Sequence, residues 1–328
     1  MTQAAIIREA YREAFSRVPD FNIQDLARQL SISHGHIQAA RIGEGVTGLA
    51  LTPCDLVMRL PSLGALEITT PSSCSMLSSR SDQLKIASSD SSTVSLRMLL
   101  PHWHWACLNQ DEYPSIEVFD RYGRLLHRLA SRTDSPVAEG WQRIARLQIE
   151  HQPAFTELVD IHREPVGATA PELPDLADEW SALRSDSDIT TLLNKHRLRR
   201  VEAYAALENR FTQRMTPQGF IATLERAAQA QRPLRLGIAN TGAIHHHTGV
   251  FGHVGRRQRH IEACGSRATL RIEREAIAHT WMVSYPSEGS MRTRLEAFGS
   301  NGRLIASLTD AAPIRMPAST MRAMSVFG

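Results

Sequence analysis

Three consecutive histidines are the first residues in this chain whose types and spacing could do chemistry. His245, His246 and His247 lie in the run Ala243-Ile-His-His-His. The run is typical of a β-strand, so His245 and His247 share one face and His246 takes the other. Two imidazoles on one face could ligate a divalent metal. A surface strand also tolerates histidines, and that explanation is the more ordinary one.

A second pattern alternates histidine with tryptophan in Pro101-His-Trp-His-Trp105. In an extended segment both tryptophans face one side and both histidines the other. We interpret the tryptophan side as core.

Arginine dominates the basic residues. Of the 37 Lys and Arg only Lys85 and Lys195 are lysine. A GC-rich genome explains most of this excess, although arginine also binds carboxylates and phosphates bidentately. Two basic runs, residues 195–200 and 253–260, could meet such anions, and their usual place is a solvated face. The net charge of +3 is small for a chain of 328 residues and does not indicate which class of partner it binds.

Several function classes find no support in the motifs. There is no G-x-S-x-G elbow, Walker loop or H-E-x-x-H, and the four cysteines have no ligand spacing. The G-x-G-x-x-G match at 43–48 follows a predicted helix and precedes Pro53, so it is a loop. Residues 25–41 have the pattern of a DNA-binding helix-turn-helix, but its second helix offers few groove-reading side chains.

The elements that position these residues form two similar series. Helices are predicted at 6–18 and 23–41, strands from 56 to 129 and a helix at 137–150. The second half repeats this order, with helices at 189–207 and 217–230 followed by strands. Residues 115–129 overlay 294–308 as two similar hairpins. We predict an α+β fold of two tandem repeats, each an antiparallel β-sheet with flanking helices: residues 1–162, a linker and helix start at 163–187, and residues 188–328.

Four features together resemble the HemS/HmuS type of hemin-utilisation protein: residues 26–47, the two Glu-x-Phe-x-x-x-Gly hairpins, residues 240–249 and residues 276–281. The resemblance covers the whole chain. It implies a cytoplasmic protein of a Gram-negative bacterium that takes up imported haem, holds it in a cleft between the repeats, and passes it on or degrades it oxidatively.

The resemblance also assigns roles position by position. Arg97 falls on the family's distal arginine, and Ser187 falls where the family has its axial histidine. A hydroxyl is a poor ligand for haem iron, so we interpret Ser187 as a helix N-cap. Gly237 and Arg235 fall on pocket positions of a strand, and Tyr285 falls on a basic pocket position.

Another residue must then ligate the iron if haem is bound. Tyr285 and His247 are the candidates, because phenolate and imidazole both ligate haem iron. His196 lies nine residues beyond Ser187, about half a helical rotation away in direction, and is a poor replacement. The family's late pocket arginine falls near Ala312.

We therefore expect a cytoplasmic protein that carries haem or a related tetrapyrrole. Oxygenase-type degradation would need one open face of the iron, with Arg97 bonded to the distal oxygen. The expected partners are a haem-uptake transporter or a haem oxygenase, with no nucleic acid and no membrane span, in a monomer or homodimer. The serine at 187 motivates an alternative: a diverged paralogue without haem chemistry that binds another anion or regulates through the helix-turn-helix.

Overall fold

The chain divides into two compact units in the computed structural model. The structure describes residues 2–18, 23–84, 93–110, 113–156, 175–257, 259–287 and 289–311. The first unit consists of Met1–Pro71, Ser78–Asp160 and Ala239–His245, and the second of Ser72–Leu77, Ile161–Ile238 and His246–Gly328. Strands β3 (Ser75–Ser81) and β11 (Ala243–Val250) contribute residues to both units. The predicted boundaries at 162 and 187 remain a prediction.

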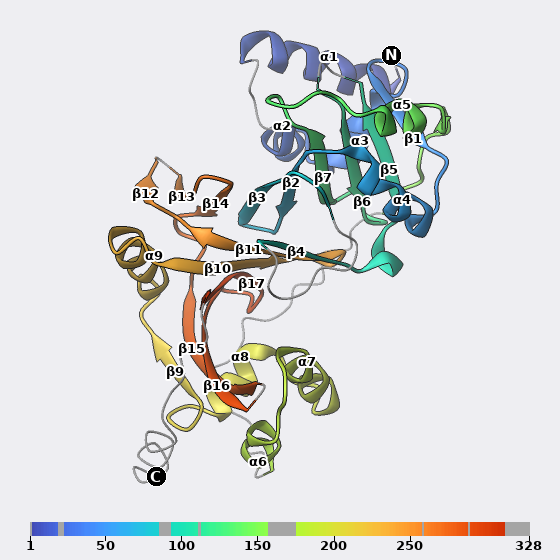
Figure 1. The fold of residues 1–328 in the computed structure, drawn as a ribbon. Helices are drawn as coiled ribbons and strands as arrows, with labels where there is room; N and C mark the ends of the chain where they lie inside the picture. Colours follow the sequence, from blue (N-terminus) through green and yellow to red (C-terminus); the bar gives the residue numbers. More distant parts are fainter. Residues whose placement is uncertain are drawn as a thin grey trace. The chain divides into compact units, whose positions relative to one another are not determined.

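The first unit is an antiparallel sheet with short helices (Figure 1). Its strands run in the order β2-β7-β6-β5-β1-β8. A core of Leu, Ile, Val and Trp side chains packs α4, η1 and α5 against this sheet. Its elements are α1 (Gln3–Arg17), α2 (Ile23–Gln29), α3 (His34–Ala40), β1 (Val46–Leu49), α4 (Pro53–Arg59), η1 (Leu60–Leu63), β2 (Leu66–Pro71), β4 (Val94–Met98), η2 (Leu100–His102), β5 (Trp105–Asn109), β6 (Ser115–Phe119), β7 (Leu125–Ser131), α5 (Glu139–Ala145) and β8 (Gln148–Ile149).

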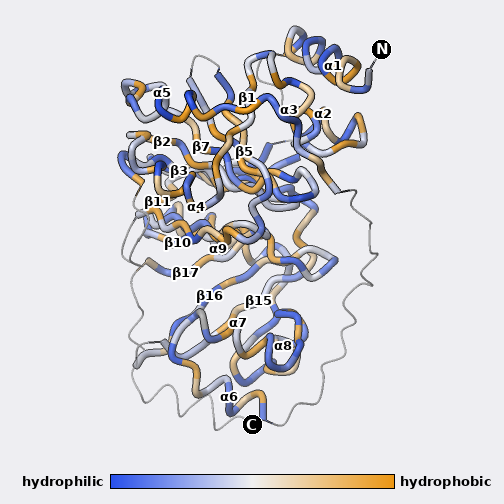
Figure 2. The backbone as a smooth tube through the Cα atoms, turned by 90° about the vertical axis from the view of Figure 1, so that its right-hand side faces the viewer, coloured by the Kyte–Doolittle hydropathy of each residue, from blue (hydrophilic) through white to orange (hydrophobic). Residues whose placement is uncertain are grey.

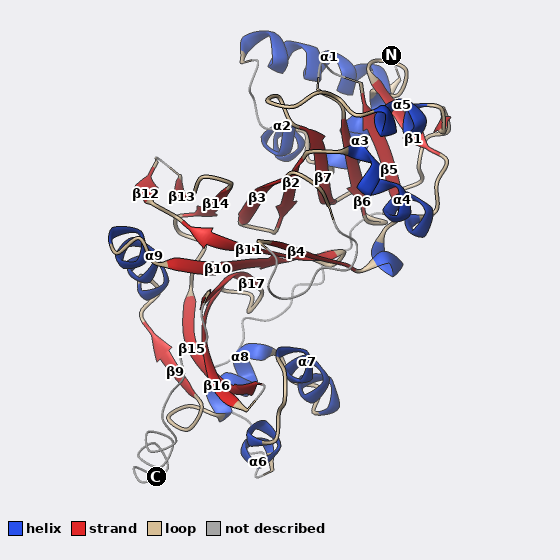
Figure 3. Ribbon diagram, in the orientation of Figure 1, coloured by secondary structure: helices blue, strands red, loops and turns tan. Residues whose placement is uncertain are grey.

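The second unit has its own antiparallel sheet, in the order β10-β17-β16-β15-β9, and a smaller set β12-β13-β14. Helices α6 to α8 gather at one end of β15 and β16, while α9 lies beside β10 (Figure 3). Its elements are α6 (Leu176–Ser181), α7 (Asp186–Lys195), α8 (Arg200–Ala206), β9 (Thr212–Met215), α9 (Gly219–Gln229), β10 (Pro233–Ala239), β12 (His253–Arg256), β13 (His260–Cys264), β14 (Ala268–Glu273), β15 (His279–Ser287), β16 (Ser290–Phe298) and β17 (Leu304–Asp310).

The sheet of the second unit has two different faces. Leucines and isoleucines of β10, β16 and β17 form one core with α9. On the other face, Trp281, Val283 and Tyr285 pack against α6, α7 and α8. Hydrophobic and hydrophilic residues accordingly alternate along α7 and α8 (Figure 2). We call the second surface the α7–α8 face.

The predicted repeat is confirmed in the backbone. Hairpin β6–β7 shifts register between Val118 and Phe119, and hairpin β16–β17 shifts between Ala297 and Phe298. The turns between α2 and α3 and between α7 and α8 each contain a left-handed residue, Ser31 at φ 53° in the first. The same local sequence pattern therefore makes the same hairpin and the same helix pair twice.

Some predicted elements differ from the observed ones. The helix predicted at 137–150 ends at Ala145, because residues 148–149 pair with β1. The predicted linker contains helix α6. This helix is joined to β15 by a hydrogen bond in which the indole Nε1–H of Trp180 donates to the carbonyl of Ser284 at 2.9 Å. Residues 163–174 of the predicted linker, Lys85 and Ala312 lie outside the described residues. Among the described helices, none is long and apolar enough to cross a membrane.

Candidate functional site

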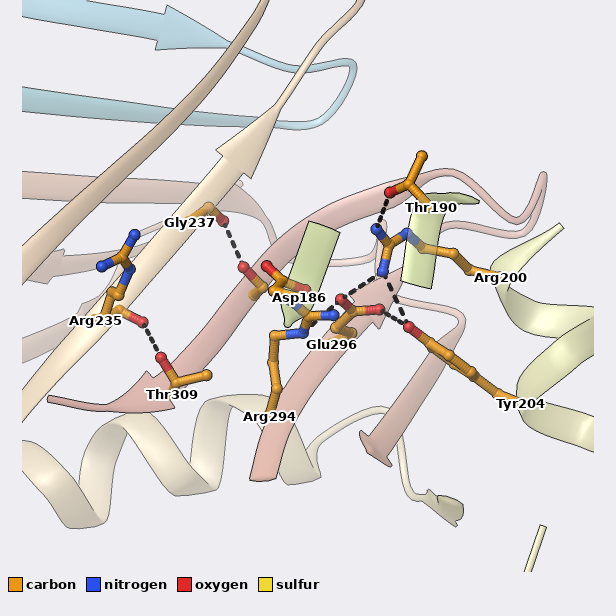
Figure 4. A network of polar contacts seen from close by, with 10 residues as sticks. Asp186, Thr190, Arg200, Tyr204, Arg235, Gly237, Arg294, Glu296 and Thr309 are labelled. Carbon is orange, nitrogen blue, oxygen red and sulfur yellow. Dashed lines mark hydrogen bonds and ion pairs between the residues drawn. The ribbon is translucent and has the colours of Figure 1, made fainter. Parts of the chain in front are cut away.

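The register of the second-unit sheet places four residues in one row across the α7–α8 face. Gly237 pairs with Ser307, Ser307 with Glu296, and Glu296 with Trp281. Directly opposed residues of antiparallel strands point to the same side. The neighbouring row contains Arg235, Thr309 and Arg294 (Figure 4). Two of the residues expected in the site, Arg235 and Gly237, therefore lie on one face with a charged network.

Helix α7 begins beside this network. The carboxylate of Asp188 accepts the backbone N–H groups of Arg184 and Ser185, both at 2.9 Å, which closes the helix start. Ser185 is the N-cap and Asp186 the first helical residue. The interpretation of Ser187 as the N-cap was wrong by two residues, because the helix begins at Asp186 with Ser185 as its N-cap. The side chain of Ser187 lies outside the described residues.

Glu296 is the centre of the network and is 1% exposed. The hydroxyl of Tyr204 donates to it at 2.7 Å, and Nη1 of Arg200 lies 3.3 Å away (Figure 4). Nε of Arg294 lies 2.8 Å from the same carboxylate. Burial and the negative charge of Glu296 both raise the pKa of Tyr204, so its phenol keeps the proton it donates.

Arg294 connects Glu296 to Asp186 at the start of α7, donating from Nη1 to Asp186 at 2.5 Å. Burial disfavours the charged guanidinium, but Glu296 and Asp186 outweigh it and raise the pKa of Arg294. Burial likewise opposes ionisation of Asp186, while Arg294, Arg200 and His246 together hold the pKa of this carboxyl below its usual value. Arg294 and Asp186 therefore form an ion pair at neutral pH.

His246 enters the α7–α8 face from β11. A Cβ added to Gly237 would lie 2.6 Å from Cδ2 and 2.9 Å from Nε2 of His246, so the imidazole occupies the space over this glycine. The side chain is half-buried. The predicted alternation of the three histidines is confirmed, because His245 and His247 are buried, at 0% and 3% exposure. The interpretation of that pair as surface histidines was wrong, since other side chains cover the strand.

The two residues expected to ligate iron have closed surroundings. His247 packs edge-on against Phe251 at 5.8 Å, and burial, with Arg267 nearby, lowers the pKa of His247 to about 4. Tyr285 is 4% exposed and has the Arg294 guanidinium 5.2 Å from its ring centre. Burial raises the pKa of Tyr285, which keeps it a neutral phenol. Ligation by either residue stays a prediction.

The structure also places the other residues that the sequence singled out. Arg97 lies exposed on β4 in the first unit. Trp103 and Trp105 are buried while His102 and His104 are exposed, as the alternation predicted. Within the described residues, no group of three His, Cys, Asp or Glu side chains could hold a metal ion.

The first unit carries the counterpart of the network. Glu117, 2% exposed, accepts the side-chain amide of Gln38 at 2.8 Å and lies 3.1 Å from Nε2 of His34. Both partners belong to α3, of whose seven residues six are buried. A recognition helix must present side chains to a DNA groove. The residues of α3 therefore belong to the core of this unit, and this helix is not available to read DNA.

Sequence inspection missed Arg294, Asp186 and His246 as site residues. Glu117 and Glu296 were visible as a repeated position, and a glutamate between apolar strand residues is the signal that could have revealed a buried charged network.

Comparison with known proteins places these features in context. Residues 197–317 match the family model described as the haemin-degrading HemS.ChuX domain. The hemin transport protein HemS of Yersinia enterocolitica is 24% identical over 321 residues, covering 92% of this chain and 91% of that protein. The heme-binding protein PhuS of Pseudomonas aeruginosa, in its apo crystal structure, has a TM-score of 0.83 at 23% identity, with 98% of each chain covered. The heme degrading enzyme ChuS of Escherichia coli O157:H7 has a TM-score of 0.84 at 19% identity, with 99% of each chain covered. These structural likenesses confirm the α+β tandem-repeat fold.

Proposed function

We propose that this chain, which is similar to HemS-type proteins, binds haem and takes part in haem utilisation. The observation that carries the proposal is the charged α7–α8 face of the second unit. Two carboxylates, Asp186 and Glu296, lie there against the cations of Arg200 and Arg294, and Arg235 lies on β10 of the same sheet. Such a face suits a ligand that carries anionic carboxylates.

One buried atom supports the fit of a carboxylate. Nη2 of Arg294 has no hydrogen-bond partner among the described residues, although the side chain is only 7% exposed. A buried guanidinium donor without a partner costs free energy that an incoming carboxylate oxygen would recover. The propionates of haem are carboxylates of this kind. Arg200 and Arg294 would orient such a ligand, and Tyr204 would hold Glu296 in place behind them.

The finer part of the proposal is oxidative degradation of the bound haem in the cytoplasm. Bound haem would supply the iron that takes up O₂, and electrons would come from an external reductant. Arg97 would donate hydrogen bonds to the distal oxygen from its exposed guanidinium. Release to a haem oxygenase or delivery from a haem-uptake transporter would fit the carrier role equally.

A haem titration tests the binding proposal. Purified protein at micromolar concentration is titrated with haemin, and the difference spectrum is followed in the Soret region. We expect a saturable shifted band at one haem per chain. Arg294→Gln is expected to weaken binding at least tenfold, whereas Arg226→Gln, on the exposed surface of α9, leaves it unchanged. The absence of a saturable shift in the unaltered protein would overturn the function.

A second assay separates carriage from degradation. The haem complex is mixed with ascorbate in air, and the Soret band is followed together with the tetrapyrrole products. Loss of the band with product formation, slowed at least tenfold by Arg97→Ala but not by Arg59→Ala on α4, would support the enzyme. A stable band would leave a carrier and eliminate degradation.

A further inference from the structure

At one pair of neighbouring strand positions the two repeats carry different side chains. Gly237 pairs with Ser307 in the second unit, as Thr69 pairs with Arg128 in the first. Thr69 shares a hydrogen bond with Ser78 on the next strand, at 2.8 Å between the hydroxyl oxygens. In the second unit the corresponding neighbour of Gly237 is His246. A hydroxyl pair in one repeat is thus a glycine and an imidazole in the other.

The glycine is required for this arrangement. A Cβ at position 237 would lie 2.6 Å from both the imidazole and Oγ of Ser307, which is closer than non-bonded atoms approach. Gly237 has no unusual φ that would otherwise demand glycine. Its role is therefore to leave room for the ring of His246 on the α7–α8 face.

The surroundings of His246 suit a metal-binding imidazole. Asp186 is close enough for His246 to help stabilise its negative charge. Asp186 is itself fixed by Arg294 and by its place at the start of α7.

The two other candidate iron ligands are less suited than His246. His247 points to the opposite side of β11 and packs on Phe251. Tyr285 is covered by Arg294 and keeps its proton. His246 is half-buried and lies on the same sheet face as Arg235 and Arg294, which can bind carboxylates.

We infer that His246, held over Gly237 on the α7–α8 face, is the residue that coordinates haem iron in this chain. The inference rests on the proposed function, because it presupposes that haem binds. It replaces both His247 and Tyr285 as the ligand, and it assigns Gly237 as a positioning residue. In this arrangement the residue that would hold the iron comes from β11.

The test compares haemin with metal-free protoporphyrin. Wild type, His246→Gln and the control His260→Gln, exposed on β13, are titrated with each. We expect His246→Gln to lose the shifted Soret band and to bind haemin at least tenfold more weakly, while its affinity for metal-free protoporphyrin changes less than threefold. His260→Gln should match the wild type with both. Far-ultraviolet circular dichroism checks that each variant is folded.

The outcomes are separable. No binding of either porphyrin by the wild type would overturn the proposed function itself. Haemin binding by His246→Gln with an unchanged band would overturn only the ligand assignment. Equal weakening towards both porphyrins would also overturn it, because the residue would then act by packing. As a second check, His246→Gly should recover the band on addition of imidazole, and failure of a folded variant to do so would contradict coordination.

Discussion

The two buried glutamates offer a matched comparison of stability. We predict that Glu296→Gln destabilises the protein more than Glu117→Gln, although the residues occupy equivalent hairpin positions and are 1% and 2% exposed. The difference lies in their cationic partners. Arg294 is 7% exposed, so removal of Glu296 leaves a guanidinium charge buried with Asp186 alone.

The partners of Glu117 tolerate the change better. The Arg128 side chain is 40% exposed, so water can solvate its guanidinium when the carboxylate is removed. The amide of Gln38 can donate to a glutamine oxygen as it does to the carboxylate. Breaking a buried ion pair on one side costs about 3–5 kcal/mol, whereas loss of one buried hydrogen-bonded charge with adaptable partners costs about 1–3 kcal/mol. We therefore expect a difference of about 2 kcal/mol, or about 30-fold in the unfolding equilibrium.

Urea denaturation followed by circular dichroism and tryptophan fluorescence measures the difference. Two probes are needed because a chain of two units need not unfold in one step. The tryptophans Trp180 and Trp281 report on the second unit. Glu208→Gln, exposed in the same unit, is the control and should change stability by less than about 0.5 kcal/mol. If Glu117→Gln costs as much as Glu296→Gln, the argument from partner burial is wrong.

Three further substitutions test single contacts. Burial lowers the pKa of His127 to about 3, so between that pH and about 6.5 only the unfolded state binds the proton. Acidification from pH 7 to 5 should then remove about 2 kcal/mol of stability at this site, and urea titrations of His127→Gln should show a shallower pH slope than the wild type. Gly237→Val should displace His246 and remove the shifted Soret band from a protein that still melts cooperatively; an intact band would contradict the packing argument. Gly140→Ala would place a Cβ 2.1 Å from the carbonyl oxygen of Ser62, so thermal melts should show a loss of about 1–3 kcal/mol, and an unchanged melting temperature would refute the close approach.

Short-range pattern was enough to predict the repeat. The hairpins around Gly123 and Gly302 depend on residues adjacent in sequence, and the left-handed φ of both glycines, 72° and 70°, explains their conservation between the two repeats. The opposite orientation of His246 and its neighbours followed from strand alternation alone. Such features depend on local geometry, which a sequence carries directly.

The site itself depends on contacts that no local pattern contains. No local pattern marks His246 as a site residue, because the space that its ring occupies is left by Gly237 on another strand. Arg294 and Asp186 are far apart in sequence and meet through the fold. The end of the helix that follows β7 was also misjudged, because pairing with β1 decides that residues after Ala145 form a strand.

The divergence of the two networks suggests how one scaffold acquired a charged site. The arginine that faces Glu117 in the first repeat is Arg128, whose side chain is 40% exposed and therefore solvated. Arg200 and Arg294 cannot deprotonate at any relevant pH, so the second repeat holds two permanent cations, which Glu296 and Asp186 balance. A permanent cation in a buried position must be balanced by fixed carboxylates or by an incoming anion. Among the described residues Nη2 of Arg294 has no hydrogen-bond partner, so it is the donor in the second repeat that an anionic ligand would satisfy, and the imidazole of His246 lies on the same face.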